Sequence, residues 1–120
     1  MITATAVQRV RQGSEDRLIA LMKDLTAKVK AGEPGCAFFQ YLKTSAQDRT
    51  YLVIEQYIDE EAFTYHHNTD YLKSFIPQMM ECLEQPPDVV VYHDVFQGVA
   101  RNVCSEQRTS SESSESPNRA

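Results

Sequence analysis

Tryptophan is absent from this sequence, and cysteine and glycine are scarce, with three and four residues. The cysteines, Cys36, Cys82 and Cys104, form no C-x-x-C pair, so neither a zinc knuckle nor a disulfide framework is indicated. No apolar run approaches the roughly 20 residues of a membrane-spanning helix, and the N-terminus lacks a signal-peptide core. We therefore expect a cytoplasmic protein with reduced thiols and no membrane partner.

Several cofactor motifs are missing as well. The sequence contains no G-x-G-x-x-G, no P-loop and no G-x-S-x-G elbow. The adjacent His66 and His67 would diverge by roughly 100° on a helix, which makes them a poor pair of metal ligands. The net charge of −5 disfavours nucleic acid, which needs a basic face. The sequence thus contains no motif that indicates a metal or a nucleotide cofactor, and its charge argues against a nucleic-acid partner.

The length of 120 residues and the hydrophobic fraction of 42% fit one globular domain. Apolar residues nearly vanish after Cys104, where serine alternates with glutamate, asparagine and arginine. We expect a folded domain over residues 1–97 and a Ser/Glu-rich disordered tail over residues 98–120. The simplest interpretation of the tail is a solvated chain, and phosphorylation of its serines is the alternative.

Strand and helix periodicities alternate along the domain. Helical spacing covers residues 14–31, and a second helical region runs from Ala62 to Leu83. In that region we expect a new cap at Asn68 or Thr69 and a kink or fresh start at Pro77. Four segments have the alternation or the β-branched content of strands: residues 2–11, 36–44, 49–58 and 88–96.

This order, β-α-β-β-α-β, is that of an α+β ferredoxin-like fold, a four-stranded antiparallel sheet with both helices on one face. Every strand has apolar residues in both phases, so the face without helices would expose an apolar surface. Such a surface favours association. We expect a homodimer that packs through this open sheet face.

The stretch from Glu55 to Tyr71 is the densest in groups that move protons. Glu55 and Tyr57 share one face of a strand. If this face looks toward the helices, Glu55 lies in an apolar layer and needs a histidine or tyrosine partner to stay charged. If the phase is reversed, Glu55 lies in the dimer interface, paired with Arg9 or Arg11 of a neighbouring copy.

His66 is the best candidate for a general base, since histidine titrates near neutral pH. It lies three residues after Phe63 and therefore on roughly the same helix face. A pair with Glu55 would orient and strengthen the base. The alternative is a structural histidine bonded to a strand backbone. The neighbouring His67 points elsewhere, toward the surface.

Aromatic residues and methionine supply candidate walls for an aromatic-substrate site. Tyr71, Phe75 and Met79 form a stripe along the last helix, which is equally typical of plain core. Cys36 has no basic neighbour in the sequence and is expected to be inert. The remaining candidates lie on three strands and the short helix: Phe39, Tyr41, Tyr51, Phe63, and either Tyr92 or His93, which point to opposite faces.

Three motifs carry a resemblance to a known family: Glu33-Pro34-Gly35-Cys36, Ile54-Glu55-Gln56-Tyr57 and Glu61-Ala62-Phe63-Thr64-Tyr65-His66. Over residues 1–96 the chain resembles the antibiotic biosynthesis monooxygenase (ABM) domains of the dimeric α+β barrel superfamily. Tyr57 stands where the family usually has tryptophan, and Tyr71 where many members have a second histidine. Haem-degrading relatives depend on a tryptophan, so its absence argues against that reaction.

The resemblance implies a cofactor-free monooxygenase of secondary metabolism that acts on a phenol, quinol or anthrone of polyketide type. Such substrates reduce O₂ themselves once they are deprotonated. In this role His66 would be the catalytic base, Glu55 its orienter, and Tyr57 and Tyr71 hydrogen-bond donors. The family also implies two alternatives, a non-oxidative isomerase, decarboxylase or cyclase, and a ligand-binding or assembly protein without catalysis.

Overall fold

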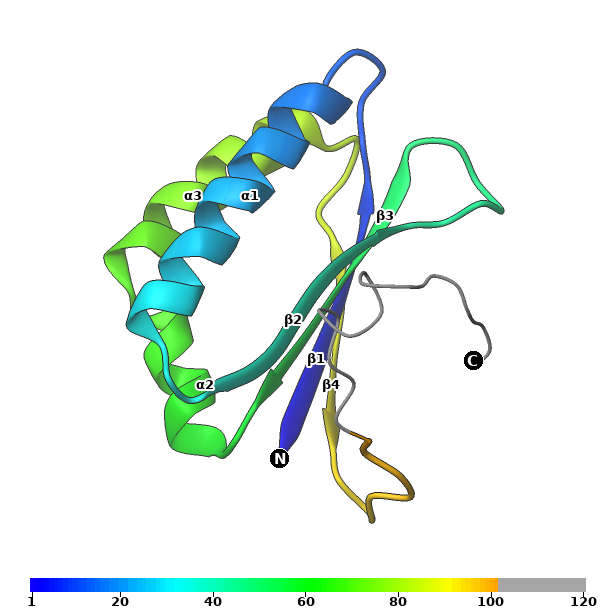
Figure 1. The fold of residues 1–120 in the computed structure, drawn as a ribbon. Coiled ribbons are helices and arrows are strands. Elements are labelled where there is room, and N and C mark those ends of the chain that lie inside the picture. The colour runs from blue at the N-terminus through cyan, green and yellow to red at the C-terminus, as the bar shows by residue number, and fades with distance from the viewer. Residues whose placement is uncertain (102–120) are drawn as a thin grey trace, which may run out of the picture.

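The computed structural model of the protein describes residues 1–101. Four antiparallel strands form one sheet in the order β2-β3-β1-β4, and all helices cover one of its faces (Figure 1). This confirms the α+β ferredoxin-like fold. The strands are β1 (Ile2–Arg9), β2 (Cys36–Lys43), β3 (Thr50–Tyr57) and β4 (Asp88–His93), and the helices are α1 (Glu15–Gly32), α2 (Glu60–His67) and α3 (Asp70–Cys82).

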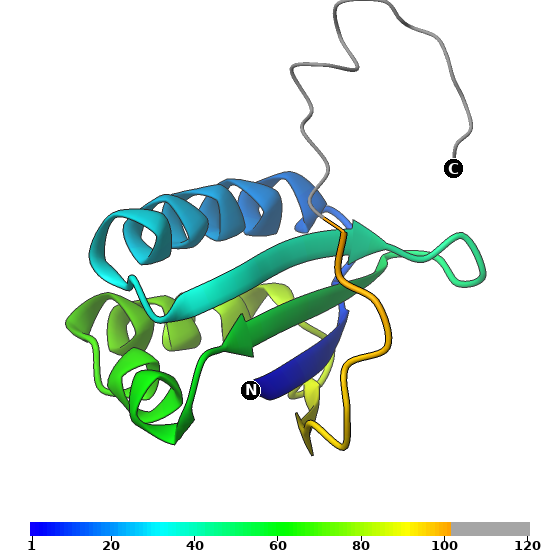
Figure 2. The same cartoon turned by 60° about the horizontal axis from the view of Figure 1, so that its bottom comes forward.

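The core lies between the helix layer and the sheet. Helices α1 and α3 lie side by side over the strands in both views (Figures 1 and 2). Each turns an apolar stripe inward, and both stripes close over Tyr51 and Val53 of β3. Burying one such aliphatic side chain contributes about 1.5–3 kcal/mol to the stability of the fold. The buried stripes therefore hold both helices against the sheet. The stripes are Leu18, Met22, Leu25 and Val29 on α1, and Leu72, Phe75, Met79 and Cys82 on α3.

The second helical region is divided in two by side-chain caps. Asp59 accepts a hydrogen bond from the backbone N–H of Ala62 at 2.8 Å and begins α2. Thr69, one of the two expected caps, accepts from the N–H of Leu72 at 3.4 Å and begins α3. The fresh start predicted at Pro77 was wrong. Helix α3 continues through this exposed residue, since a carbonyl left without a donor on the solvent side can bond water.

The C-terminal strand is shorter than predicted. It ends at His93 instead of residue 96, and residues 94–101 form neither helix nor strand. Of the predicted Ser/Glu-rich tail, residues 102–120 lie outside the described residues. Within residues 1–101 no helix has the length and apolar character that a membrane crossing requires.

Strand β4 lies at an edge of the sheet, and the helices do not cover it. Val89 and Val91 face the helix side, because their partners Ala6 and Ala4 do, yet they are 60% and 43% exposed. Val90 and Tyr92 face the open side and are 45% and 50% exposed. Apolar side chains are therefore exposed on both faces of β4.

Candidate functional site

The structure decides which way Glu55 points. Glu55 lies opposite Ala4, and both share the phase of Tyr57, a fully buried residue on the helix side. Glu55 therefore faces the helices and not the open face. The alternative, in which Glu55 faces a dimer interface and pairs with Arg9 or Arg11 of a neighbouring copy, requires the opposite phase of β3.

His66 of α2 is held between two carboxylates. Its Nδ1–H donates to Oε1 and Oε2 of Glu33, at 2.9 and 3.0 Å. Its Nε2 lies 3.5 Å from Oε1 of Glu55, which is ion-pair range. The side chains of His66 and Glu33 are each 2% exposed. His66 is thus buried against side-chain carboxylates and not against a strand backbone.

A tyrosine closes each end of this arrangement. The hydroxyl of Tyr57 donates to Oε1 of Glu55 at 2.6 Å, and the hydroxyl of Tyr71 donates to Oε2 of Glu33. Burial is the main cause that raises the pKa of both tyrosine hydroxyls far above the ordinary value, and the adjacent carboxylate raises it further. Both hydroxyls therefore stay protonated and act as donors. We call these five residues, Tyr71, Glu33, His66, Glu55 and Tyr57, the carboxylate–histidine chain.

Glu33 is the member that the sequence reasoning missed. It caps the C-terminal end of α1, where its backbone N–H donates to the carbonyl of Val29 at 2.9 Å and its carbonyl accepts from the N–H of Cys36 at 3.0 Å. A glutamate between a helix-ending glycine and a Pro-Gly turn normally points to water. The only available signal was its place in the motif Glu33-Pro34-Gly35-Cys36, which by itself assigns no role.

Gly35 brings the turn that carries Glu33 against the helix that carries His66. A Cβ on Gly35 would lie 2.6 Å from the Cβ of Ala62. The carbonyl of Gly35 also accepts from the N–H of Ile58 at 3.0 Å, which fixes the turn to the end of β3. Only glycine allows this approach without moving α2.

We therefore expect Gly35→Ala to lower the free energy of unfolding by about 1–3 kcal/mol, because the added methyl group overpacks the contact with Ala62. Ala62→Gly removes the methyl group on the other side and should restore most of the loss in the double variant. Urea unfolding of both single variants and the double variant measures this coupling. Strictly additive effects would show that the two positions do not compete for space.

The residues of the carboxylate–histidine chain differ in their access to solvent. The side chain of Glu55 is 18% exposed, whereas that of His66 is 2% exposed. Within residues 1–101, Oε2 of Glu55 has no hydrogen-bond or ion-pair partner. Neither His66, the expected base, nor Glu55 lines the hollows that the structure describes among residues 1–101. Oε2 of Glu55 is therefore the one carboxylate oxygen of this cluster that is left without a partner among residues 1–101.

Two open hollows flank the Glu33 turn, of about 450 Å³ against α2 and about 300 Å³ against β2. Phe39 and Cys36 line the second. Burial raises the pKa of the Cys36 thiol, which supports an inert packing role. Among residues 1–101 no cluster of three His, Cys, Asp or Glu side chains is placed to hold a metal ion.

Only some of the predicted aromatic residues lie next to the carboxylate–histidine chain. Phe63 packs edge-on against Tyr57, with ring centroids 5.6 Å apart. Phe75 and Met79 are buried in the core. His93 lies on the helix side opposite Ile2. Tyr92 lies on the open face opposite Thr3, so it does not belong to a site on the helix side, because neighbouring strand residues point to opposite faces.

Tyr41 and Tyr51 form a separate pair, stacked with centroids 5.2 Å apart. The Tyr41 hydroxyl donates to Oε1 of the buried Gln8 at 2.6 Å, and the Tyr51 hydroxyl donates to Oε2 of Glu15 at 2.5 Å. Both hydroxyls are therefore engaged by groups outside the carboxylate–histidine chain. These two tyrosines pack in the core and do not extend the site around Glu55.

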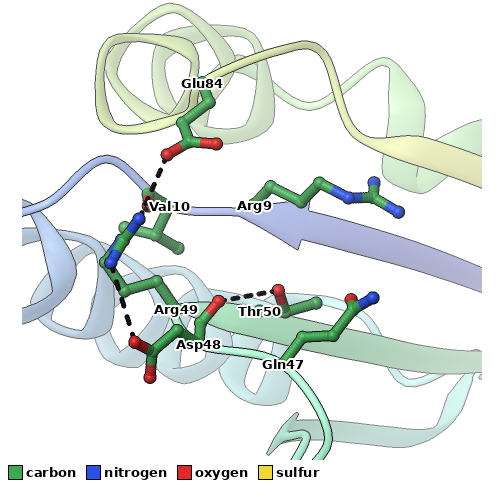
Figure 3. A pocket seen from close by; sticks show the side chains of 7 residues that line it. All are labelled: Arg9, Val10, Gln47, Asp48, Arg49, Thr50 and Glu84. Carbon is green, nitrogen blue, oxygen red and sulfur yellow. Dashed lines mark hydrogen bonds and ion pairs between the residues drawn. The ribbon is translucent and has the colours of Figure 1, made fainter.

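A polar hollow of about 240 Å³ lies at the opposite end of the sheet, where Arg9 pairs with Thr50 (Figure 3). Arg49 extends between Glu84 and Asp48, and its Nε donates to the carbonyl of Val10 at 3.0 Å. The arginines are already paired with carboxylates, so they leave little unbalanced charge for a ligand. These contacts close the β2–β3 hairpin against β1.

The protein is similar in sequence and in fold to one family of known proteins. A family model described as "Antibiotic biosynthesis monooxygenase" matches residues 1–78. The crystal structure of a putative antibiotic biosynthesis monooxygenase from Caulobacter crescentus is similar, with 29% identity and a TM-score of 0.76 over 79% of this chain and 90% of that one.

Two curated proteins are also similar in sequence. Putative monooxygenase YcnE of Bacillus subtilis is 26% identical over 90 residues, which cover 75% of this chain and 94% of that protein. An uncharacterized protein of Synechocystis sp. is 24% identical over 84 residues, or 70% of this chain. In that case the match spans only 56% of the relative's length.

Proposed function

The chain belongs to the antibiotic biosynthesis monooxygenase family, and on that premise we propose that it is a cofactor-independent monooxygenase of phenol-, quinol- or anthrone-type aromatic metabolites. The observation that supports this most is the state of Glu55. One of its oxygens accepts from Tyr57 and lies near His66, while the other has no partner among residues 1–101, on a side chain that is 18% exposed. A carboxylate oriented in this way is suited to remove a proton from a bound ligand.

The reaction begins when Oε2 of Glu55 takes the proton from an acidic hydroxyl or CH₂ group of the substrate. The bond to hydrogen breaks, and its electron pair stays on the aromatic system. This electron-rich anion reduces O₂ and combines with it to form a peroxide anion, which takes the proton back from Glu55. Loss of water from the peroxide leaves one oxygen atom on the substrate, so that a CH₂ group and O₂ become a carbonyl group and water.

In this proposal the roles first expected of two residues are exchanged. Glu55 is the base that touches substrate, and His66 stands behind it, shielded by the two carboxylates. A buried imidazole beside the base supplies a positive partner when it is protonated, and that charge offsets the developing anion. Tyr57 donates to the same carboxylate and fixes its orientation.

Apolar side chains on the helix side offer a surface for the aromatic ring. Val91 lies opposite Ala4, which in turn lies opposite Glu55, and the small Ala4 side chain leaves Val91 accessible. Ile76 and Met80 lie on the flank of α3 away from α1 and are 42% and 37% exposed. We place the ring of the substrate between this flank and β4.

A panel of anthrones, quinols and phenols, incubated with the protein under air and under argon, tests the proposed reaction. We expect products that have gained oxygen, detected by mass spectrometry, under air only. Equal turnover under argon would instead assign a non-oxidative isomerase, decarboxylase or cyclase that uses the same deprotonation. Ligand binding without turnover in either atmosphere would assign a binding protein.

We further propose that the protein is a homodimer formed through the open face of the sheet. Phe38, Leu42, Val90 and Tyr92 give this face an apolar character, and each is at least 38% exposed. A stable interface of ordinary size buries roughly 1,600 Å² and excludes charge from its centre.

Phe38→Glu and Val90→Glu are expected to convert the dimer into a monomer, because each places an unpaired carboxylate in the interface. Tyr65→Glu is the matched control, since Tyr65 is 57% exposed on α2, on the other side of the molecule. Sedimentation velocity at micromolar concentration distinguishes the two states. A monomeric parent protein, or a variant that stays dimeric, would contradict the proposed interface.

A further inference from the structure

Glu33 has a different position from Glu55, although both carboxylates flank the same imidazole. Its side chain is 2% exposed, and its oxygens are fully engaged by His66 and Tyr71. Glu33 therefore has no free atom for a substrate. Whatever it contributes to the site has to act through the histidine.

Burial of a carboxylate is costly unless a positive charge and good hydrogen bonds compensate for the lost water. Nδ1–H of His66 supplies one donor to both oxygens, and Tyr71 supplies the second. Tyr71 stays neutral, since burial and the contact with Glu33 raise its pKa. The imidazole of His66 is therefore the one group in direct contact that can neutralise Glu33.

The geometry on the other side of the ring leads to the same conclusion. Nε2 lies 3.5 Å from Oε1 of Glu55. If Nε2 carried a lone pair, two acceptors would face each other, which is unfavourable. With a proton on each ring nitrogen, the contacts with Glu33 and Glu55 are both attractive.

The other groups around the ring do not oppose a positive charge on it. Tyr57 of β3 packs against the imidazole with centroids 5.2 Å apart and remains protonated. His67 of the same helix lies 5.3 Å away, but it is exposed, and its Nδ1–H donates to the carbonyl of Phe63 at 2.9 Å. Within residues 1–101 no arginine or lysine pairs with Glu33 or Glu55.

We propose that Glu33 is a positioning residue that holds His66 as an imidazolium, so that Glu55 stays ionised and ready to accept the substrate proton. This inference rests on the proposed function, because it explains how that site is kept poised. When Oε2 of Glu55 takes the proton, an O–H bond forms there and the cluster loses one negative charge. His66 keeps both of its protons, and none moves to Glu33.

Glu33→Gln is the sharpest variant, because it keeps the volume of the side chain and one carbonyl acceptor for Nδ1–H while it removes the charge. Glu61→Gln is the matched control. It removes the same charge from an exposed position on α2, the helix that carries His66. Glu61 makes no hydrogen bond or ion pair with His66 in the described structure.

¹⁵N NMR of histidine-labelled protein at neutral pH reads the state of the ring directly. We expect both ring nitrogens of His66 to be protonated in the parent protein and in Glu61→Gln, and one to be deprotonated in Glu33→Gln. The exposed His67 and His93 serve as references in the same spectrum. A neutral His66 in the parent protein overturns the proposal without any variant, so a failure of Glu33→Gln to fold does not prevent the test.

Kinetics supply the second measurement. Glu33→Gln should lower kcat by about 10²-fold, the lower end of the effect of a positioned acid–base group, with KM unchanged. The two proposals fail separately. Absence of turnover with any substrate removes the oxygenase, while the NMR result still decides the role of Glu33. Turnover with a neutral His66, or with an imidazolium that persists in Glu33→Gln, would refute the role proposed for Glu33. The oxygenase proposal would then still stand.

Discussion

His66→Ala is expected to lower the free energy of unfolding by about 3–5 kcal/mol, the cost of removing one partner from a buried ion pair. The physical reason is Glu33, which is 2% exposed and would keep only Tyr71 as a donor. The loss of the ring would also leave a cavity against Tyr57, with which it packs at 5.2 Å. Urea unfolding at neutral pH, followed by circular dichroism, measures the change.

His67→Ala is the control for this prediction, since His67 is the adjacent residue on α2 and is exposed. Its effect should stay within about 0.5 kcal/mol, as for other surface substitutions. Removal of both charges in Glu33→Met together with His66→Leu should recover part of the stability, because apolar residues of similar volume often replace a buried pair at little cost. Equal losses for His66→Ala and His67→Ala would refute the buried pair.

Glu55→Gln is expected to lower kcat by about 10²–10⁴-fold, the usual contribution of a general base. The amide keeps a carbonyl oxygen for the Tyr57 hydroxyl, and the side chain is partly exposed, so the fold should tolerate the change. The substitution should lower kcat more than it changes KM, because the missing carboxylate acts on the proton during its transfer in the transition state. Steady-state oxygen consumption, with the substrate identified from the panel, provides the measurement.

Glu61→Gln again serves as the control for charge, with activity close to that of the parent protein. Thermal unfolding of Glu55→Gln should show a cooperative transition similar to the parent, which separates a chemical effect from a folding defect. If Glu55→Gln keeps full activity while the fold is intact, the base is another group, and the exchange of roles between Glu55 and His66 is wrong.

Local sequence pattern was not enough to assign the roles of Glu55 and His66. Helical spacing predicted correctly that His66 points inward and that His67 points outward. Spacing cannot tell whether an inward side chain reaches a ligand or is sealed by its neighbours. Here Glu33, brought from 33 residues away in the chain, occupies one edge of the imidazole and leaves the histidine without access to solvent.

The carboxylate–histidine chain itself is assembled from four separate segments: the turn after α1, the end of β3, α2 and the first turn of α3. Glu55 and Tyr57 could be paired from the sequence, since alternate residues of a strand share a face. Tyr71 was identified through the family resemblance, at the place where many members have a second histidine. Glu33 could not be found in this way, because its burial depends on Gly35 allowing the turn to approach Ala62.

By itself, the sequence determined the order of the elements and the apolar stripes of α1 and α3, and it limited the new cap to Asn68 or Thr69, because periodicity and capping are local properties of the backbone. It also identified Glu55, His66, Tyr57 and Tyr71 as a group. Tertiary structure alone decided that Glu55 faces the helices, that Glu33 joins the group, and that His66 is enclosed by carboxylates. Those outcomes depend on strand register and on the close approach of distant segments, which no local pattern encodes.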